Sequence, residues 1–158
     1  MGRPSASRWA EAAKPGDEVG LGGPRGSFVV PTGFDWHLLV GDETAIPAIA
    51  RRLEELPDTA QAIAVIETGD AGDRRSFTTR ARLQAHWVES GPVDALARAV
   101  AALTLPAGEG FAWAAGEAAS MVAVRQALVD GHGLDKSRVR ASAYWKRGSA
   151  GHHETLGG

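Results

Sequence analysis

Two turns in this sequence contain residue types that can bind a polar or charged ligand. The first turn places Gly41, Asp42, Glu43 and Thr44 between an apolar run and a helical pattern. Gly41 permits a tight strand-to-helix turn, and Thr44 can cap the helix. Free backbone N–H groups at such a helix start favour a phosphate, whereas the two carboxylates favour contacts with ribose hydroxyls or an amide. A plain acidic helix start without any ligand explains these residues equally well.

The second turn is centred on Gly116 and Glu117, with small residues around it. Small residues at a strand end let a planar ring or another stretch of backbone approach closely. Close packing of a helix on its strand explains the same pattern. Neither turn has the full Gly-x-Gly-x-x-Gly fingerprint, so neither identifies a dinucleotide by itself.

A basic aromatic cluster, formed by Trp145, Lys146 and Arg147, follows the last predicted strand. An aromatic ring beside two cations suits stacking on a ligand ring or binding of an anion. A surface anchor for the C-terminus is the alternative. Arg74 and Arg75 lie in a polar loop, where contact with a 2′-phosphate competes with simple solvation.

Other catalytic chemistries find little support in the sequence. The absence of cysteine excludes a thiol nucleophile, disulfides and cysteine-ligated metals. His37 and His86 lie within predicted strands and are interpreted as structural, and the histidines at 152–153 belong to a solvated tail. We find no Ser–His–Asp arrangement, paired catalytic carboxylates or zinc motif. Any redox chemistry would therefore depend on a bound cofactor.

The elements that must position these residues alternate between strands and helices from residue 36 onward. Strands are predicted at 36–40, 63–66, 82–88, 111–115 and 139–144, and helices at 45–56, 93–103 and 118–129. This alternation predicts an α/β fold: a mostly parallel five-stranded sheet with helices on both faces. Ligands of such sheets bind beyond the carboxyl ends of the strands, where both turns are expected.

Composition restricts the class of protein. The chain has 158 residues, of which 44% are hydrophobic and 23% are charged, and its net charge is −2. These values predict one globular domain and argue against a nucleic-acid-coating protein. No apolar run has the length of a membrane span, and the N-terminus lacks the apolar core of a signal peptide. We therefore expect a cytoplasmic protein.

The segment before the alternating pattern has a different character. Ser5 or Ser7 can cap a short helix, and short strands are predicted at 18–21 and 27–30. About three strands with an apolar backing are needed for an independent sheet. Residues 1–33 therefore look like the end of another domain. Open strand edges there predict pairing with a partner or a tendency to aggregate.

Five strings of residues resemble the siderophore-interacting protein family, and the match is collinear across almost the whole chain. They are 6–10 with 15–17, 23–28, 41–49, 113–117 and 139–148. The resemblance implies a ferredoxin-reductase-like flavoprotein in which an N-terminal barrel binds FAD and a C-terminal α/β domain binds NADH or NADPH. Electrons then pass to a ferric siderophore, and Fe(II) is released because it binds hard oxygen ligands less tightly.

The resemblance also assigns site residues. It places the FAD phosphates near Ser7 and the flavin near Trp145, with Lys146 and Arg147 facing the anionic siderophore. The nicotinamide nucleotide is assigned to the two turns, that is, to Gly41, Asp42, Glu43, Thr44, Gly116 and Glu117.

One departure from the family concerns the flavin-binding barrel. Its Arg-x-Tyr-Ser/Thr motif, which grips the flavin ring, is expected before residue 1. We accordingly predict a barrel remnant at 1–33, an NAD(P)H-binding domain at 34–148 and a flexible tail at 149–158. The predicted function is the NAD(P)H-binding part of a flavin-dependent ferric-siderophore reductase, with a partner chain or homodimer supplying the flavin domain. A non-catalytic nucleotide- or siderophore-binding module and a general flavin reductase are the alternatives.

Overall fold

The computed structural model describes residues 33–148 and 154–156. Its strands are β1 (Trp36–Asp42), β2 (Gln61–Thr68), β3 (Arg82–Glu89), β4 (Gly110–Glu117), β5 (Val139–Trp145) and β6 (Glu154–Leu156). Its α-helices are α2 (Ile46–Glu55), α3 (Ala95–Ala101) and α4 (Ala118–Gln126), with short helical turns η1 (Glu43–Ala45), η2 (Ala71–Asp73), η3 (Ala127–Gly131) and η4 (Lys136–Arg138). Ser7 and the rest of the segment 1–32 lie outside the described residues, so the predicted barrel remnant is not tested.

The described strands form one sheet in the order β3-β2-β1-β4-β5-β6. Strands β1 to β5 are parallel, which confirms the predicted five-stranded parallel sheet. A sixth strand was not predicted. Its three residues lie within the range expected to be a tail and pair antiparallel with Ala141, Ser142 and Ala143 of β5. A strand this short has too few residues for its alternation to be recognised in a sequence.

The strand order reverses at β1. The chain moves outward from β1 to β2 and β3, then returns to place β4 on the other side of β1, with Gly41 beside Ala115. The carboxyl ends of β1 and β4 are therefore neighbours. This is the position at which open parallel sheets bind ligands, and both turns singled out in the sequence meet there.

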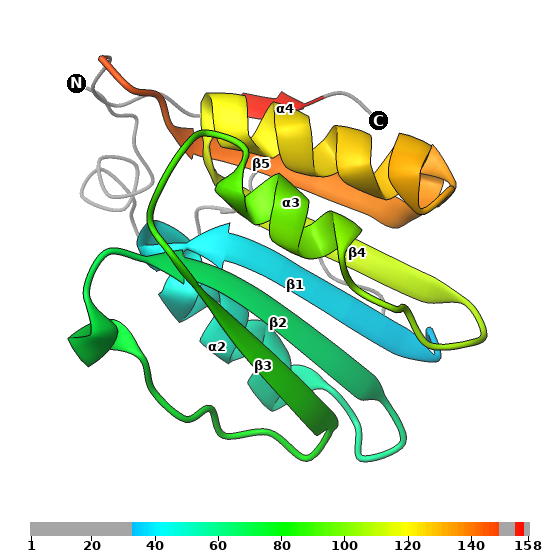
Figure 1. The fold of residues 1–158 in the computed structure, drawn as a ribbon. Coiled ribbons are helices and arrows are strands. Elements are labelled where there is room, and N and C mark those ends of the chain that lie inside the picture. Colours follow the sequence, from blue (N-terminus) through cyan, green and yellow to red (C-terminus); the bar gives the residue numbers. More distant parts are fainter. Residues whose placement is uncertain (1–32, 149–153, 157–158) are drawn as a thin grey trace, which may run out of the picture.

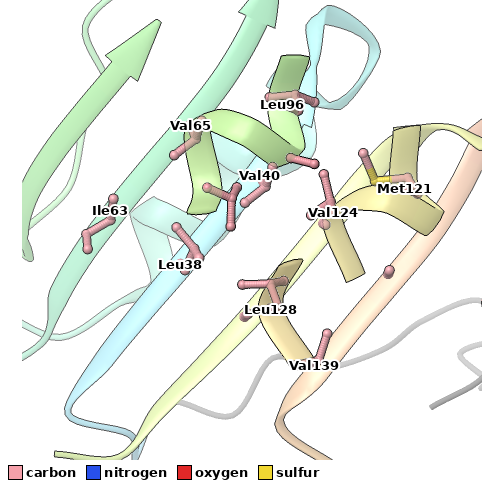
Figure 2. Packing of buried hydrophobic residues seen from close by; sticks show 14 of the residues in the cluster. Leu38, Val40, Ile63, Val65, Leu96, Met121, Val124, Leu128 and Val139 are labelled. Carbon is pink, nitrogen blue, oxygen red and sulfur yellow. The ribbon is translucent and has the colours of Figure 1, made fainter. Parts of the chain in front are cut away.

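Helices cover both faces of the sheet, as predicted: α2 lies on one face, and α3 and α4 lie on the other (Figure 1). Central strand β1 is buried on both sides, which explains its near-continuous apolar sequence. Leu38 and Val40 pack into the core beneath α3 and α4, which Figure 2 shows with Met121, Val124 and their neighbours. Leu39 faces the second core, beneath α2.

The pattern of residues 45–56 predicts one apolar stripe of Ile46, Ile49, Ala50 and Leu53, with the charged residues Arg51, Arg52, Glu54 and Glu55 opposite. In helix α2, Ile46, Ile49 and Leu53 are buried, whereas Ala50 is half-buried. Arg52 was predicted to point away from the sheet, and this prediction was wrong. Its guanidinium carbon lies 4.2 Å from the centroid of the Trp113 ring. Burial, as the largest cause, lowers the pKa of Arg52. The long side chain can cover an aromatic ring while it extends from the edge of the apolar stripe.

Strand β3 lies at the edge of the sheet, where its residues are less covered than expected. The alternation in residues 82–88 predicts that Leu83, Ala85 and Trp87 face inward. Leu83 and Trp87 pack partly into the core beneath α2, as predicted, and the Phe77 ring stacks on Trp87 with centroids 6.2 Å apart. Ala85, also predicted to be buried, is exposed. An edge strand extends past its covering helix, so alternation alone does not determine burial there.

Two helix boundaries differ from the predicted ones. Helix α3 is shorter than the predicted 93–103 at both ends, and its first turn has no side-chain cap. Helix α4 ends at Gln126 and continues as the π-helical turn η3. In the described part of the chain, no helix has both the length and the apolar character that a membrane crossing requires.

Candidate functional site

Asp42, the last residue of β1, connects three separate segments at the carboxyl edge of the sheet. Its Oδ1 accepts hydrogen bonds from the backbone N–H (3.0 Å) and the hydroxyl of Thr44. Its Oδ2 accepts from the indole Nε1–H of Trp145 at 2.8 Å and from the backbone N–H of Glu117 at 3.2 Å. Only 7% of Asp42 is exposed. Charged acceptors in such surroundings form strong hydrogen bonds, so this carboxylate holds the end of β5 against both turns.

Glu117, the last residue of β4, has a corresponding role at α4. Its Oε1 accepts from the backbone N–H groups of Ala119 at 3.0 Å and Ser120 at 3.1 Å, which caps the helix. Its Oε2 accepts from the backbone N–H of Arg147 at 3.2 Å. With 4% of its surface exposed, Glu117 is buried beneath the residues that it binds. The start of α4 and the chain beyond β5 are thus joined through one side chain.

The backbone N–H groups of Thr44, Ala119 and Ser120 are therefore occupied by the protein's own carboxylates. We expected free N–H groups after β1 and a Thr44 cap; the N–H of Thr44 is instead bonded by Asp42, and the Thr44 cap was wrong. Asp42 caps η1, Thr44 donates to it, and α2 itself begins after Ala45 without a side-chain cap. The physical reason is that a carboxylate carries the negative charge that a helix start favours. A phosphate would have to displace Asp42 or Glu117 to bind there.

The two glycines are explained by close packing within the protein. A Cβ added at Gly41 would lie 2.6 Å from the Cβ of Ala45 and 2.8 Å from the carbonyl oxygen of Ala115. A Cβ at Gly116 would lie 2.8 Å from Oδ2 of Asp42. Glycine at these positions therefore lets Asp42 and β4 approach. No ligand is required to explain either residue, which was the packing alternative considered for Gly116.

The basic aromatic cluster lies across these turns. Trp145 is anchored by its side chain on Asp42, and Arg147 by its main chain on Glu117. The guanidinium carbon of Arg147 is 5.8 Å from the centroid of the Trp145 ring, within the range of a cation–π contact. The side chains of Lys146 and Arg147 are exposed. Two cations are thus presented at an edge whose buried groups are acidic.

The end of β2 adds residues that the sequence analysis missed. Glu67 lies beside Asp42 in the parallel register, and its Oε2 accepts from the backbone N–H of Gly91 at 3.2 Å. Burial is the main cause that raises the pKa of Glu67, and the nearby charges of Asp42 and Glu43 add to it. Thr68 contacts Glu43 through its hydroxyl at 3.5 Å. The polar end of the 63–66 apolar run was the signal that could have identified these residues.

Not all candidate residues join the site. Arg74 and Arg75 are exposed in the loop after η2. Across the described residues, no hydrogen bond or ion pair connects their side chains to Asp42 or Glu117. His37 lies at the opposite end of β1 and is fully buried. Within residues 33–148 and 154–156, no group of His, Asp and Glu side chains is arranged to hold a metal ion.

The sequence profile described as siderophore-interacting protein matches residues 34–148. The chain belongs to the siderophore-interacting protein family. The match confirms the resemblance found in the sequence. It covers strands β1 to β5 and the helices described above. The turns after β1 and β4 and the basic aromatic cluster all lie within the matched range.

Named relatives of this siderophore-interacting family member include reductases. Ferric vibriobactin reductase ViuB of Vibrio cholerae is 33% identical over 145 residues, which cover 89% of this chain and 54% of that protein. An NADPH-dependent ferric-chelate reductase of Escherichia coli is 35% identical over 143 residues, which cover 89% of this chain and 56% of that protein. The chain thus spans about half the length of the curated relatives it matches.

Solved structures give the same family. A siderophore utilization protein from T. fusca superimposes with a TM-score of 0.72 and 34% identity, covering 96% of this chain and 60% of that one. The siderophore-interacting protein SipS from Aeromonas hydrophila gives a TM-score of 0.68 and 26% identity, covering 94% and 60%. The fold of the described residues is therefore that of siderophore-interacting proteins.

Proposed function

We propose that this chain is the NAD(P)H-binding part of a flavin-dependent ferric-siderophore reductase. The observation that supports this most directly is the hydrogen bond between Asp42 and Trp145, which brings the basic aromatic cluster across the β1 and β4 turns. The cluster therefore lies at the point of strand-order reversal, where nucleotides bind in open parallel sheets. Two relatives named as ferric-chelate or ferric-siderophore reductases support the same reaction class.

The residues at this edge fit a nicotinamide nucleotide in a particular way. The helix-start donors are satisfied by Asp42 and Glu117, so its phosphates would be held by exposed cations, Lys146 and Arg147. The exposed carboxylate of Glu43 can accept hydrogen bonds from ribose hydroxyls or the carboxamide. Arginine suits this task because its planar guanidinium can bind phosphate or carboxylate oxygens in pairs.

When bound, FAD would supply the conversion of a two-electron donor into one-electron reduction of Fe(III). We propose that Trp145 borders the flavin and that Ser7, outside the described residues, receives its phosphates. We also propose the division into residues 1–33, 34–148 and 149–158, and a cytoplasmic location. The rest of the flavin site would come from preceding sequence, a partner chain or a second copy.

The ferric siderophore is the substrate of the proposed reaction. Its negative charge makes Lys146 and Arg147 its natural partners as well, because both side chains are exposed at the edge. Reduction to Fe(II) lowers the charge of the ion and weakens its binding by hard oxygen ligands. Release of iron then follows from the chemistry of the ion.

An absorbance titration tests this proposal. The purified chain is titrated with FAD, and NADPH-dependent reduction of a ferric hydroxamate or catecholate is followed with a ferrous-specific chelator. We expect flavin uptake and reduction that falls when Lys146 and Arg147 are both changed to alanine. Absence of both flavin uptake and nucleotide binding would contradict the proposal. Chelate binding without electron transfer would indicate a binding module, and reduction of free flavin without preference for a siderophore would indicate a flavin reductase.

A further inference from the structure

A continuous series of contacts leads from the buried carboxylate of Asp42 to the exposed guanidinium of Arg147. The Asp42 Oδ2 holds the indole N–H of Trp145 at 2.8 Å. The ring of Trp145 lies 5.8 Å from the guanidinium carbon of Arg147. The main chain of Arg147 is fixed separately, by Oε2 of Glu117 at 3.2 Å. Asp42 therefore determines where the ring lies, and the ring in turn limits where the guanidinium lies.

We propose that Asp42 is a positioning residue for anion recognition: it orients Trp145 and thereby holds Arg147 at the carboxyl edge to bind an anionic group of the ligand. This inference rests on the proposed function and deepens it. The shared chemistry of the ligand is a multiply charged oxyanion, and both a nucleotide phosphate and a ferric chelate carry it. Arg147 remains accessible because its backbone, not its guanidinium, is bound by Glu117.

The direction of the effect separates this role from simple electrostatics. Asp42 is an anion close to the proposed anion site, so on charge alone its removal should strengthen binding of another anion. If Asp42 instead positions Trp145 and Arg147, removing its charge should weaken binding of the anion. Asp42→Asn keeps the shape of the side chain, but one of its two acceptor atoms becomes a donor. It therefore cannot satisfy all four hydrogen bonds that Asp42 accepts.

Trp145→Phe tests the same contact from the other side. This variant keeps an aromatic ring beside Arg147 but lacks the indole N–H donor. Glu89→Gln is the matched charge control. Glu89 ends β3 at the same edge of the sheet and is exposed, so its change removes one negative charge without touching the Asp42–Trp145 contact.

The experiment measures calorimetric affinities of the whole chain for NADPH and, separately, for a ferric tris-catecholate. Far-UV circular dichroism confirms that each variant is folded. We expect Asp42→Asn and Trp145→Phe each to weaken binding of at least one of the two anions about tenfold, and Glu89→Gln to leave it unchanged or slightly stronger. The double variant should bind no more weakly than the weaker-binding single variant, because both changes break the same Asp42–Trp145 contact.

The two titrations show which anion Arg147 receives. Unchanged or tighter binding in Asp42→Asn, or losses that add in the double variant, would overturn the positioning role. If Asp42→Asn does not fold, the affinity of Trp145→Phe decides alone. If the wild-type chain binds NADPH and the variants bind both anions equally well, only this inference is disproved. Wild-type chain that binds neither anion rejects the proposed function together with it.

Discussion

Asp42 and Glu117 occupy the backbone donors that many α/β proteins leave available to a phosphate. Each side chain is buried, and each oxygen atom has at least one N–H or O–H partner. The glycine beside each carboxylate makes this possible, since a Cβ at Gly116 would meet Oδ2 of Asp42 at 2.8 Å. Lys146 and Arg147 are exposed cations next to these occupied donors, so their side chains can recognise an anion at this edge.

His37 is a second unusual residue, far from the proposed site. It has no exposed surface, and neither of its ring nitrogens has a hydrogen-bond partner in the described structure. The ring of Phe34 meets it edge-on, with centroids 6.3 Å apart. Burial without a partner disfavours the charged imidazolium, and the pKa of His37 is accordingly lowered from its ordinary 6.5.

This burial predicts a pH-dependent loss of stability. Below pH 6.5 the unfolded chain binds a proton at residue 37 that the folded chain does not, so the free energy of unfolding falls as the pH falls. One such proton contributes a slope of up to about 1.4 kcal/mol per pH unit. Urea unfolding between about pH 7.5 and 5.5 should therefore show a shallower pH dependence for His37→Leu than for the wild type. Equal slopes would show that His37 accepts its proton in the folded state.

At the level of elements, helix α4 depends on a cap from the preceding strand. Glu117 satisfies two backbone donors of its first turn and also holds the main chain of Arg147. We expect Glu117→Ala to lower the free energy of unfolding by about 1–2 kcal/mol. Glu117→Ser should recover part of this loss, because serine can cap the helix but is too short to reach Arg147. Urea denaturation of the three proteins checks the order, and equal stability of Ala and Ser variants would contradict it.

Helix α2 also shows which features the sequence patterns predict and which they do not. The 3.6-residue stripe of α2 correctly identified Ile46, Ile49 and Leu53, because one apolar face packing on a sheet imposes that spacing. It failed for Arg52, whose aliphatic stem lets the guanidinium reach the Trp113 ring. The prediction that Thr44 caps the helix was also wrong, since the hydrogen bonds at a helix start depend on which neighbouring acceptor comes within reach.

At the level of the whole molecule, the sheet separates two cores. Ile63 belongs to the core beneath α3 and α4, and Ile49 to the core beneath α2. Each Ile→Val change should cost about 0.5–1.5 kcal/mol. Because the sheet lies between the two cores, the losses of stability should add in the double variant to within about 0.5 kcal/mol. A larger coupling energy in urea unfolding would show that the two cores rearrange together.

The family assignment applies to a chain that spans about half the length of its curated relatives. The matched residues 34–148 form strands β1 to β5 and the helices. The alignments with the curated relatives cover 54% and 56% of those proteins. The hydrogen bonds of Asp42 and Glu117 join the ends of β1, β4 and β5 to the residues that follow them, all within the described part of the chain.

The sequence alone determined the order of strands and helices along the chain, and it predicted the edge at which a ligand would bind. Alternation and apolar periodicity depend on neighbours along the chain, and they are sufficient to predict a parallel sheet with helices on both faces. Family strings added the identity of the residues at that edge. Only the tertiary structure decided how those residues are used. Asp42 and Trp145 are 103 positions apart, and their hydrogen bond exists because β4 lies between β1 and β5 in the sheet. A contact between distant segments depends on the strand order and on side-chain geometry, which no local pattern contains.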